Sequence, residues 1–390
     1  MSICKRNLIS ICILSTTAMF LAACNSGGSS TTNNTSYQMV VDAGSSGSRV
    51  YVYQVNSGTS LPSITDIFES SNKTGLATFK NNPESAGSVG IQPLLDSAIS
   101  FMNTTYGIPP QQIRASVMGT AGMRLISEPA QTAIYQYVTN TIVNDGLILG
   151  DVGTITGQDE GLYSWADVNY LQNNFNGAQT TNGIVEVGGA SAQVAYSTSS
   201  VSSSNIVSTT INGQTYNVYA ISYLGLGQDQ AVASMQALNP STKGQCYPTG
   251  YTSASITGAF NFSGCTSNYA AVTGQYGESL STMSSQAGFS SNNFIGLSSV
   301  YYALDFWGIT QTPTQLVPMI NGTCNLSWTD MQASYPGNKY LFGQCANATY
   351  MNQFLYGSLK LGSSQLTSLN TINDTALTWT LGYLLIYLSN

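Results

Sequence analysis

The chain has 390 residues, with 10 Lys and Arg, 17 Asp and Glu and a formal net charge of −7. This length allows two domains, and an acidic chain lacks the basic face that a nucleic-acid duplex requires. The sequence contains no histidine. Histidine bases, Ser-His-Asp triads and His-ligated zinc are therefore excluded, so that proton transfer falls to carboxylates, Tyr or Lys.

The N-terminus has the pattern of a secretory signal. Lys5 and Arg6 precede an apolar stretch over 8–21, which is too short and wrongly flanked to favour a membrane span. The sequence Leu-Ala-Ala-Cys24 at its end resembles a bacterial lipobox, in which the cysteine is lipidated, and cleavage by an ordinary signal peptidase is the alternative. We predict a signal peptide over 1–24 and an exported protein, periplasmic or at the cell surface, held by lipid at Cys24 or otherwise secreted.

Two segments repeat one pattern. After a Gly/Ser/Thr/Asn tract over 25–36, which predicts a flexible tether, the segment 40–50 has an apolar run, one acid, a Gly/Ser loop and a second apolar run, and 184–194 has the same order. The pattern predicts strand, tight turn, strand. Clustered backbone N–H groups in such turns bind anions, whereas the acids would repel bare phosphate. The pair therefore predicts a clamp for a metal-phosphate group.

The remaining elements alternate between strands and helices. Between the two loops, hydrophobic spacing predicts a helix, a strand and two helices, over 89–102, 113–118, 130–143 and 157–170. After the second loop it predicts a hairpin over 206–221 and helices over 228–238, 297–307, 315–320, 346–359 and 376–388. Residues 241–288 are expected to form disulfide-held loops. This alternation predicts an α/β fold.

Four cysteines lie beyond the signal and lipobox. An even number in an exported protein predicts disulfides, with three possible connectivities. Pairing between sequence neighbours is the simplest of these, and it joins Cys246 with Cys265 and Cys324 with Cys345.

Two further segments lie between the repeated loops. One, 117–125, ends a strand with a small-residue turn and a cation, and the other, 156–170, places Asp159 and Glu160 at a Gly-flanked helix start. In this order the four segments resemble the apyrases, or nucleoside triphosphate diphosphohydrolases, of the actin-like superfamily. Five later segments also look like parts of this family: 223–231, 246–251, 294–307, 345–350 and 379–383. The resemblance therefore covers residues 37–390.

The resemblance implies a fold and an activity. The fold has two actin-like (ribonuclease H-like) domains with a nucleotide cleft between them, the first over 37–165 and 372–390 and the second over 166–371. The activity is metal-dependent hydrolysis of the terminal phosphates of nucleoside tri- and diphosphates, to the monophosphate. The cofactor is Mg²⁺ or Ca²⁺, with Mn²⁺ as a further option, and the only membrane contact is the N-terminal lipid.

The resemblance also implies the catalytic residues. Glu160 is the general base that activates water, although by itself it would be interpreted as an acid favoured by the helix dipole. Ser191 and Gln193 hold the water, and at positions i and i+2 of a strand they share one face. Asp42 and Glu186 match positions that bind the cation through its waters. The family generally has Asp at the second position, and the longer Glu is expected to shift metal preference or affinity.

Other residues match positions around the substrate. Tyr350 matches the aromatic that stacks on the base, and Arg124 is expected to be structural and to pair with an acid below its loop. The residues implied to bind phosphate are Ser45, Ser46, Gly47, Arg49, Thr120, Gly189 and Ala190.

Two other functions stay open. An exopolyphosphatase of the same superfamily shares similar motifs, but its substrate needs a long basic channel, which an acidic chain disfavours. A nucleotide-binding lipoprotein with impaired catalysis is favoured only by Glu186.

Overall fold

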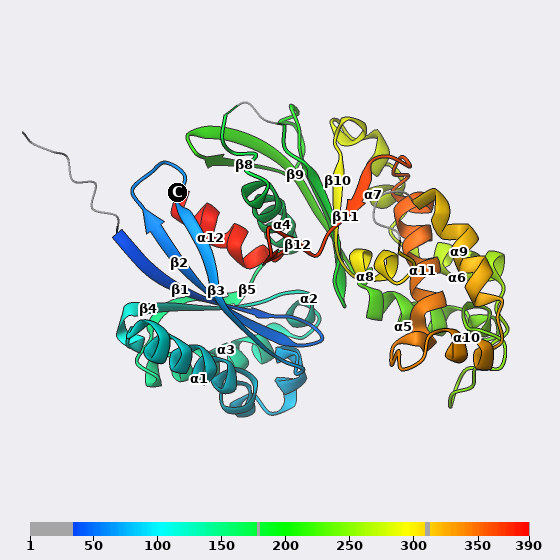
Figure 1. Cartoon of the computed structure of the whole chain (residues 1–390), viewed down its shortest axis with the longest axis horizontal. Coiled ribbons are helices and arrows are strands. Elements are labelled where there is room, and N and C mark those ends of the chain that lie inside the picture. The colour runs from blue at the N-terminus through cyan, green and yellow to red at the C-terminus, as the bar shows by residue number, and fades with distance from the viewer. Residues whose placement is uncertain (1–33, 178–179, 309–312, 390) are drawn as a thin grey trace, which may run out of the picture. The chain divides into compact units, whose positions relative to one another are not determined.

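The computed structural model describes residues 34–177, 180–308 and 313–389 (Figure 1). The predicted signal peptide, Cys24 and residues 25–33 of the predicted tether lie outside these residues. The tether prediction is wrong for its last residues, because strand β1 begins at Asn34, and Thr35 and Ser36 pair with the neighbouring strand. Among the described residues, no helix combines the length and the hydropathy needed to cross a bilayer.

The first sheet has five strands in the order β3-β2-β1-β4-β5. Strands β1, β2 and β3 form an antiparallel meander, and β4 and β5 extend the sheet in parallel. Helices α1 and α3 bury their apolar residues against one face, and the short α2 follows β4. The bounds are β1 Asn34–Ala43, β2 Ser48–Ser57, β3 Ser63–Asn72, β4 Ile113–Gly119, β5 Ile148–Thr154, α1 Gln92–Phe101, α2 Ala121–Arg124 and α3 Glu128–Asn144.

The second sheet repeats the first. Its order is β11-β10-β6-β7-β9-β8, in which β9-β7-β6-β10-β11 has the same antiparallel and parallel pairings as β3-β2-β1-β4-β5. Strand β8 adds an edge next to β9. The predicted α/β class with two related sheets is confirmed. The bounds are β6 Gly183–Val187, β7 Ser191–Ser197, β8 Ile206–Ile211, β9 Gln214–Leu224, β10 Phe294–Ser298 and β11 Leu366–Ser368.

Helices also cover the outer face of the second sheet, where they share one apolar core with β7 and β9. They are α5 Gln228–Leu238, α6 Phe262–Gly274, α7 Gly277–Ser281, α8 Ser299–Asp305, α9 Leu316–Cys324, α10 Trp328–Ser334 and α11 Gln344–Asn352. A small hairpin, β12 Thr371–Ile372 and β13 Thr375–Ala376, leads to the last helix.

Helices α4 (Gly157–Leu171) and α12 (Trp379–Ser389) belong to a core that both sheets share. The helices pack so closely that a Cβ on Gly382 would lie 1.8 Å from the carbonyl oxygen of Tyr163. The Tyr383 hydroxyl of α12 also donates to Asp151 in β5. Because α4 and α12 contact elements of both sheets, the domain limits stay a prediction.

The structure corrects two predicted segments. Residues 241–288 are not loops throughout, because α6 spans Phe262–Gly274 with the Asn261 side chain capping its first turn. Buried Cys265, Tyr269 and Val272 stand at i, i+4 and i+7, a helical spacing that the sequence prediction overlooked. The predicted helix 297–307 begins late, because its first two residues still belong to β10.

Both neighbouring cysteine pairs form disulfides, as predicted. Cys246 pairs with Cys265 and Cys324 with Cys345, and all four are fully buried. Replacing Cys324 and Cys345 together by Ser should lower the free energy of unfolding by about 2–5 kcal/mol, because the unfolded chain regains the freedom of a loop and the core loses its cross-link. Denaturant unfolding measures this change, and an unchanged midpoint would contradict it.

Candidate active site

The repeated hairpins place their acids at matching positions. In the first hairpin Asp42 of β1 lies opposite Arg49 of β2, and in the second Glu186 of β6 lies opposite Gln193 of β7. Both acids are near the end of the first strand of their hairpin, directly before the Gly/Ser turn. The fold therefore repeats one arrangement with different chemistry, since a cation faces the acid in one copy and an amide in the other.

A cavity of about 610 Å³ takes its lining from both hairpins. The lining includes eight of the predicted site residues: Asp42, Ser45, Ser46, Arg49, Thr120, Glu160, Glu186 and Gly189. Ser191 and Gln193 are about 1 % exposed, and the Gln193 amide bonds to both Glu160 and Ser191. Gly47 and Ala190 are buried in the turns themselves.

Burial changes the proton affinity of three of the acids that line this cavity, Asp42, Glu160 and Glu186. It raises the pKa of Glu160 from 4.5 to about 8, against the attraction of Arg124, while the other two acids add to the rise. It raises the pKa of Asp42 from 3.8 to about 7, which Arg49 opposes. It also raises the pKa of Glu186, although hydrogen bonds from two serines oppose this rise. All three acids therefore hold a proton more tightly than they would in water.

Hydrogen bonds hold Glu160 in place. Its Oε2 atom pairs with the Arg124 guanidinium and accepts a bond of 3.2 Å from Nε2 of Gln193. The same guanidinium lies 3.3 Å from the Ser191 hydroxyl. The prediction that Arg124 pairs with an acid therefore agrees with the structure, and the acid is the predicted base itself.

Serines hold both carboxylate oxygens of Glu186. Ser164 of α4 donates to Oε2 at 2.7 Å, and Ser298 donates to Oε1 at 3.1 Å. Ser298 has φ of +56°, a conformation that costs a non-glycine residue about 1–3 kcal/mol and is often found at functional sites. Both serines lie in segments of the family resemblance, 156–170 and 294–307, but sequence reasoning missed their role because only the packing of these segments brings them to Glu186.

The turns of the two hairpins approach each other closely. A Cβ on Gly189 would lie 2.7 Å from the Ser45 hydroxyl and 3.0 Å from a carboxylate oxygen of Asp229. The absence of a side chain at Gly189 allows this approach without displacing Ser45 or Asp229, and leaves the backbone of both turns accessible to a ligand.

Tyr350 does not reach the cavity. Its ring is fully buried, its hydroxyl donates to the carbonyl of Leu226, and its neighbours are Tyr269 at 5.2 Å and Phe354 at 5.9 Å. Contrary to the prediction, a ring covered in this way is not available to stack on a base. Tyr302 lines the cavity with 60 % of its surface exposed.

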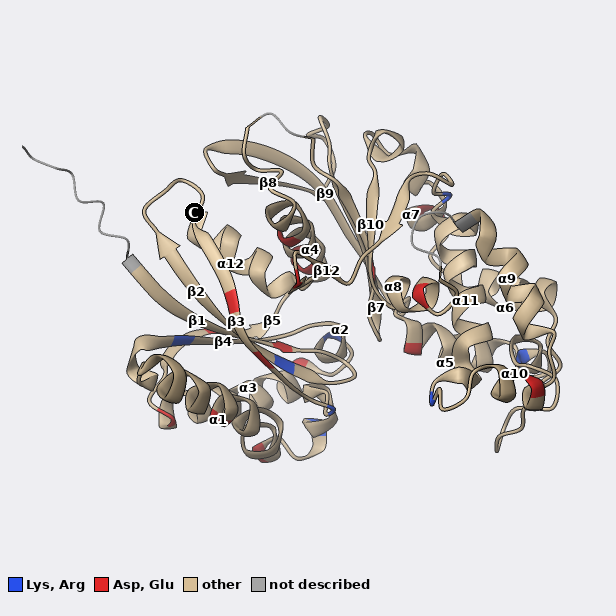
Figure 2. Cartoon of the chain, in the orientation of Figure 1, with Lys and Arg blue, Asp and Glu red and all other residues tan. Residues whose placement is uncertain are grey.

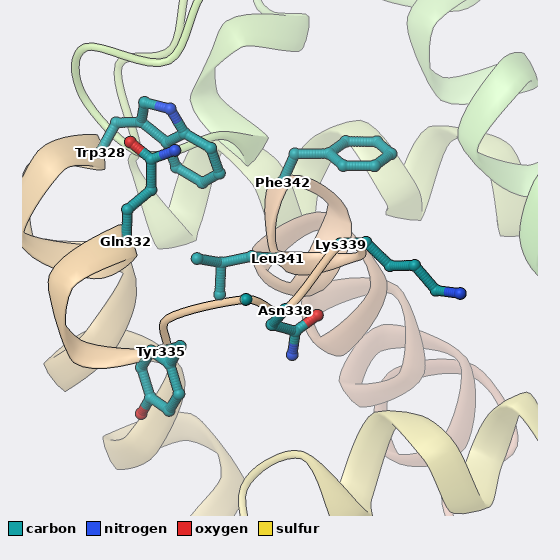
Figure 3. Close-up of a pocket in the computed structure, with 8 residues that line it drawn as sticks. Trp328, Gln332, Tyr335, Asn338, Lys339, Leu341 and Phe342 are labelled. Carbon is teal, nitrogen blue, oxygen red and sulfur yellow. The ribbon is translucent and has the colours of Figure 1, made fainter.

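A second cavity, of about 370 Å³, lies beside α10 (Figure 3). Its lining includes Trp328, Gln332, Tyr335, Lys339 and Phe342, and none of the described residues that line it carries a carboxylate. It therefore lacks the acid groups that phosphate-transfer chemistry requires.

The first cavity fits a divalent cation. Asp42 and Glu186 bring two carboxylates to it, and Oδ1 of Asp42 is buried without a hydrogen-bond partner among the described residues. The described residues contain no group of three or more acids or cysteines arranged to hold a metal by themselves. One or two carboxylates completed by waters and substrate phosphates are the usual ligands of Mg²⁺.

A family model for GDA1/CD39 (nucleoside phosphatase) proteins matches residues 29–390. The chain belongs to this family. The predicted resemblance is thus confirmed, and the chain is a hydrolase of phosphoanhydrides. Probable apyrase 3 of Arabidopsis thaliana is 29 % identical, over 83 % of this chain and 75 % of its own length. Ectonucleoside triphosphate diphosphohydrolase 2 of Rattus norvegicus is 28 % identical, over 90 % and 81 %.

Solved structures support the fold. Nucleoside triphosphate hydrolase from Neospora caninum superposes with a TM-score of 0.65 at 15 % identity, over 90 % of this chain and 92 % of its own. A Ppx/GppA family member from Aquifex aeolicus gives a TM-score of 0.54 at 12 % identity, over 91 % and 98 %. The GDA1/CD39 chain therefore has the two-sheet fold that both groups share.

The raised pKa values predict a pH-dependent stability. Asp42 and Glu160 ionise near pH 4 when unfolded but only at about 7 and 8 when folded. The stabilisation that these two groups add to the folded state is complete below their ordinary pKa values and is lost as the pH rises toward 8. In EDTA, the melting temperature should fall by several degrees between about pH 5 and 8. The Asp42→Asn variant should show a smaller fall, and a melting temperature that rises over this range would contradict the prediction.

Proposed function

We propose that the chain is an exported apyrase that removes terminal phosphates from nucleoside tri- and diphosphates, with Glu160 as general base. The observation that carries this proposal is the placement of a buried carboxylate against Gln193, whose amide also bonds to Ser191, next to two Gly/Ser turns and further acids. Family membership supports the same reaction class.

In this proposal Glu160 takes the proton of the attacking water. Its pKa of about 8 lies close to neutral pH, where a general base combines sufficient ionisation with sufficient proton affinity. Ser191 and Gln193 orient the water through their polar groups. Phosphoryl transfer depends mainly on such positioning and on charge stabilisation.

Asp42 and Glu186 would hold Mg²⁺, Ca²⁺ or Mn²⁺, and the cation when bound supplies positive charge to the phosphate oxygens. The backbone of the two turns, with the hydroxyls of Ser45, Ser46 and Thr120 and the charge of Arg49, would bind the phosphates. Tyr302 is the exposed aromatic ring that we propose for contact with the nucleoside.

An exopolyphosphatase is the second candidate, because Ppx/GppA structures share the fold. The cavity argues against it: among the described residues that line it, Arg49 is the single cation, and Lys and Arg are sparse on the chain (Figure 2). A long polyanion needs an extended basic surface.

Phosphate release from ATP, ADP, AMP and polyphosphate, each with Mg²⁺, Ca²⁺ or Mn²⁺, tests the proposal. We expect release from ATP and ADP, none from AMP and little from polyphosphate. Faster release from polyphosphate would favour the second candidate. Calorimetric binding of ATP without hydrolysis under any metal would indicate a catalytically impaired binding protein.

We propose export through the N-terminal signal, with a lipid on Cys24. Two disulfides support an oxidising compartment. Membrane fractionation of the full chain and of Cys24→Ala tests the anchor: the lipidated chain should sediment with membranes and the variant should not. Equal distribution of the two chains would favour an ordinary signal peptide.

A further inference from the structure

One face of α4 lies over a row of side chains on the second sheet. Strand pairing sets Ser222 of β9 opposite Gln193 of β7, and Gln193 opposite Glu186 of β6, so that the three side chains share a face. Above them α4 presents Glu160 to Gln193 and Ser164 to Glu186. The third member of the row, Ser222, has no role in the mechanism described so far.

Ser222 lies tightly against the start of α4. A Cβ on Gly157 would meet the Ser222 hydroxyl at 2.4 Å and Nη1 of Arg124 at 2.2 Å. The absence of a side chain at Gly157 therefore leaves room for the serine and the arginine to meet below the helix. Arg124 donates to the Ser222 hydroxyl at 3.3 Å.

The side-chain amide nitrogen of Gln193 lies within hydrogen-bond distance of more acceptors than it has hydrogens. Its Nε2 lies 2.5 Å from the Ser191 hydroxyl, 3.0 Å from the Ser222 hydroxyl and 3.2 Å from Oε2 of Glu160. An amide nitrogen carries two hydrogens. Three acceptors therefore share two hydrogens, and because the two serines are nearer than the carboxylate, the bond to Glu160 is the weakest of the three.

We propose that Ser222 is a positioning residue for hydrolysis, which draws the Gln193 amide and the Arg124 guanidinium into their working orientation. This inference rests on the proposed function. Without the Ser222 hydroxyl, the Gln193 amide turns its second N–H toward Glu160. This stronger hydrogen bond stabilises the ionised carboxylate and makes Glu160 a poorer base. The amide also loses the orientation in which it faces the water. Substrate binding does not involve Ser222, so the effect falls on kcat.

The test is a double-mutant cycle on the full chain with Mg²⁺ and ATP. Ser222→Ala should lower kcat about tenfold, as expected for a lost hydrogen bond in a charged network, with KM within about twofold of the parent. On a Gln193→Ala background the same change should lower kcat by clearly less than in the parent, because the part of its effect that acts through Gln193 is gone and only the contact with Arg124 remains. Ser208→Ala, which removes an exposed hydroxyl bonded to Asn217 on neighbouring strands, is the control and should leave kcat unchanged.

The outcomes separate two failures. If the parent chain releases phosphate but Ser222→Ala has an unchanged kcat, or if the two losses multiply fully in the double variant, the Ser222 role is wrong and the proposed function stands. If the parent chain releases no phosphate from any nucleotide, the proposed function is wrong, and the role of Ser222 in hydrolysis is wrong with it.

Discussion

Replacing Glu160 by Gln should reduce kcat for ATP and ADP at least about 10³-fold, because the amide cannot accept the proton of the attacking water. The substitution keeps the size of the side chain. It also removes the carboxylate that pairs with the buried Arg124 guanidinium, which destabilises the fold, so rates are compared at temperatures where the variant is folded. Steady-state phosphate release and thermal melting measure the two effects.

The neighbouring acid provides a matched control. Asp159 belongs to the same helix turn, but its carboxylate accepts from the Thr156 hydroxyl at 2.6 Å and does not line the cavity. Asp159→Asn should keep kcat within a few-fold, since the change affects only a helix cap. Equal losses in the two variants would show that any change at this helix start disturbs the site, which contradicts the assignment of Glu160 as base.

Replacing Arg124 by Ala should lower kcat at pH 7 about 10- to 100-fold. The guanidinium lowers the pKa of Glu160 against the effect of burial, so its loss raises that pKa further and leaves less ionised base. The rise of kcat with pH should therefore shift to higher pH. Because a buried acid without its partner also destabilises the fold, the pH profile is compared only at temperatures where circular dichroism shows a folded variant.

Arg114 is the control for this change. It forms the other ion pair among the described residues, with Asp151 at 3.3 Å, and it does not line the cavity. Arg114→Ala should keep the pH profile of the parent. A profile that is unchanged in Arg124→Ala, or that shifts equally in Arg114→Ala, would contradict the coupling between Arg124 and Glu160.

The strand-turn-strand repeat and the family motifs predicted much of this site from sequence. They indicated two related sheets and the residues that gather around Glu160, while pairing between sequence neighbours predicted both disulfides. This success has a physical basis: the acid and the Gly/Ser turn of each hairpin are close in sequence, and pairing opposite a short turn fixes their register.

The contacts that complete the site could not be predicted in this way. Arg124 meets Glu160, and Ser298 meets Glu186, only after distant elements have packed, and no local pattern encodes that packing. For Tyr350 the motif suggested a contact with the base that the buried ring does not allow. A motif gives the identity of a residue but does not tell whether its side chain is buried. The helix 262–274 was missed because Gly, Ser and Thr reduce the contrast between its buried and exposed positions.

The stereochemistry of the reaction tests the central claim, that water held by Ser191 and Gln193 attacks the terminal phosphorus directly. Hydrolysis of ATP made chiral with sulfur and oxygen isotopes at its γ-phosphorus, in isotopically labelled water, reports the number of displacements. We predict inversion at phosphorus, because one in-line attack inverts the centre. Retention would show two successive displacements through a phosphorylated side chain, and would contradict Glu160 as the base for a direct attack.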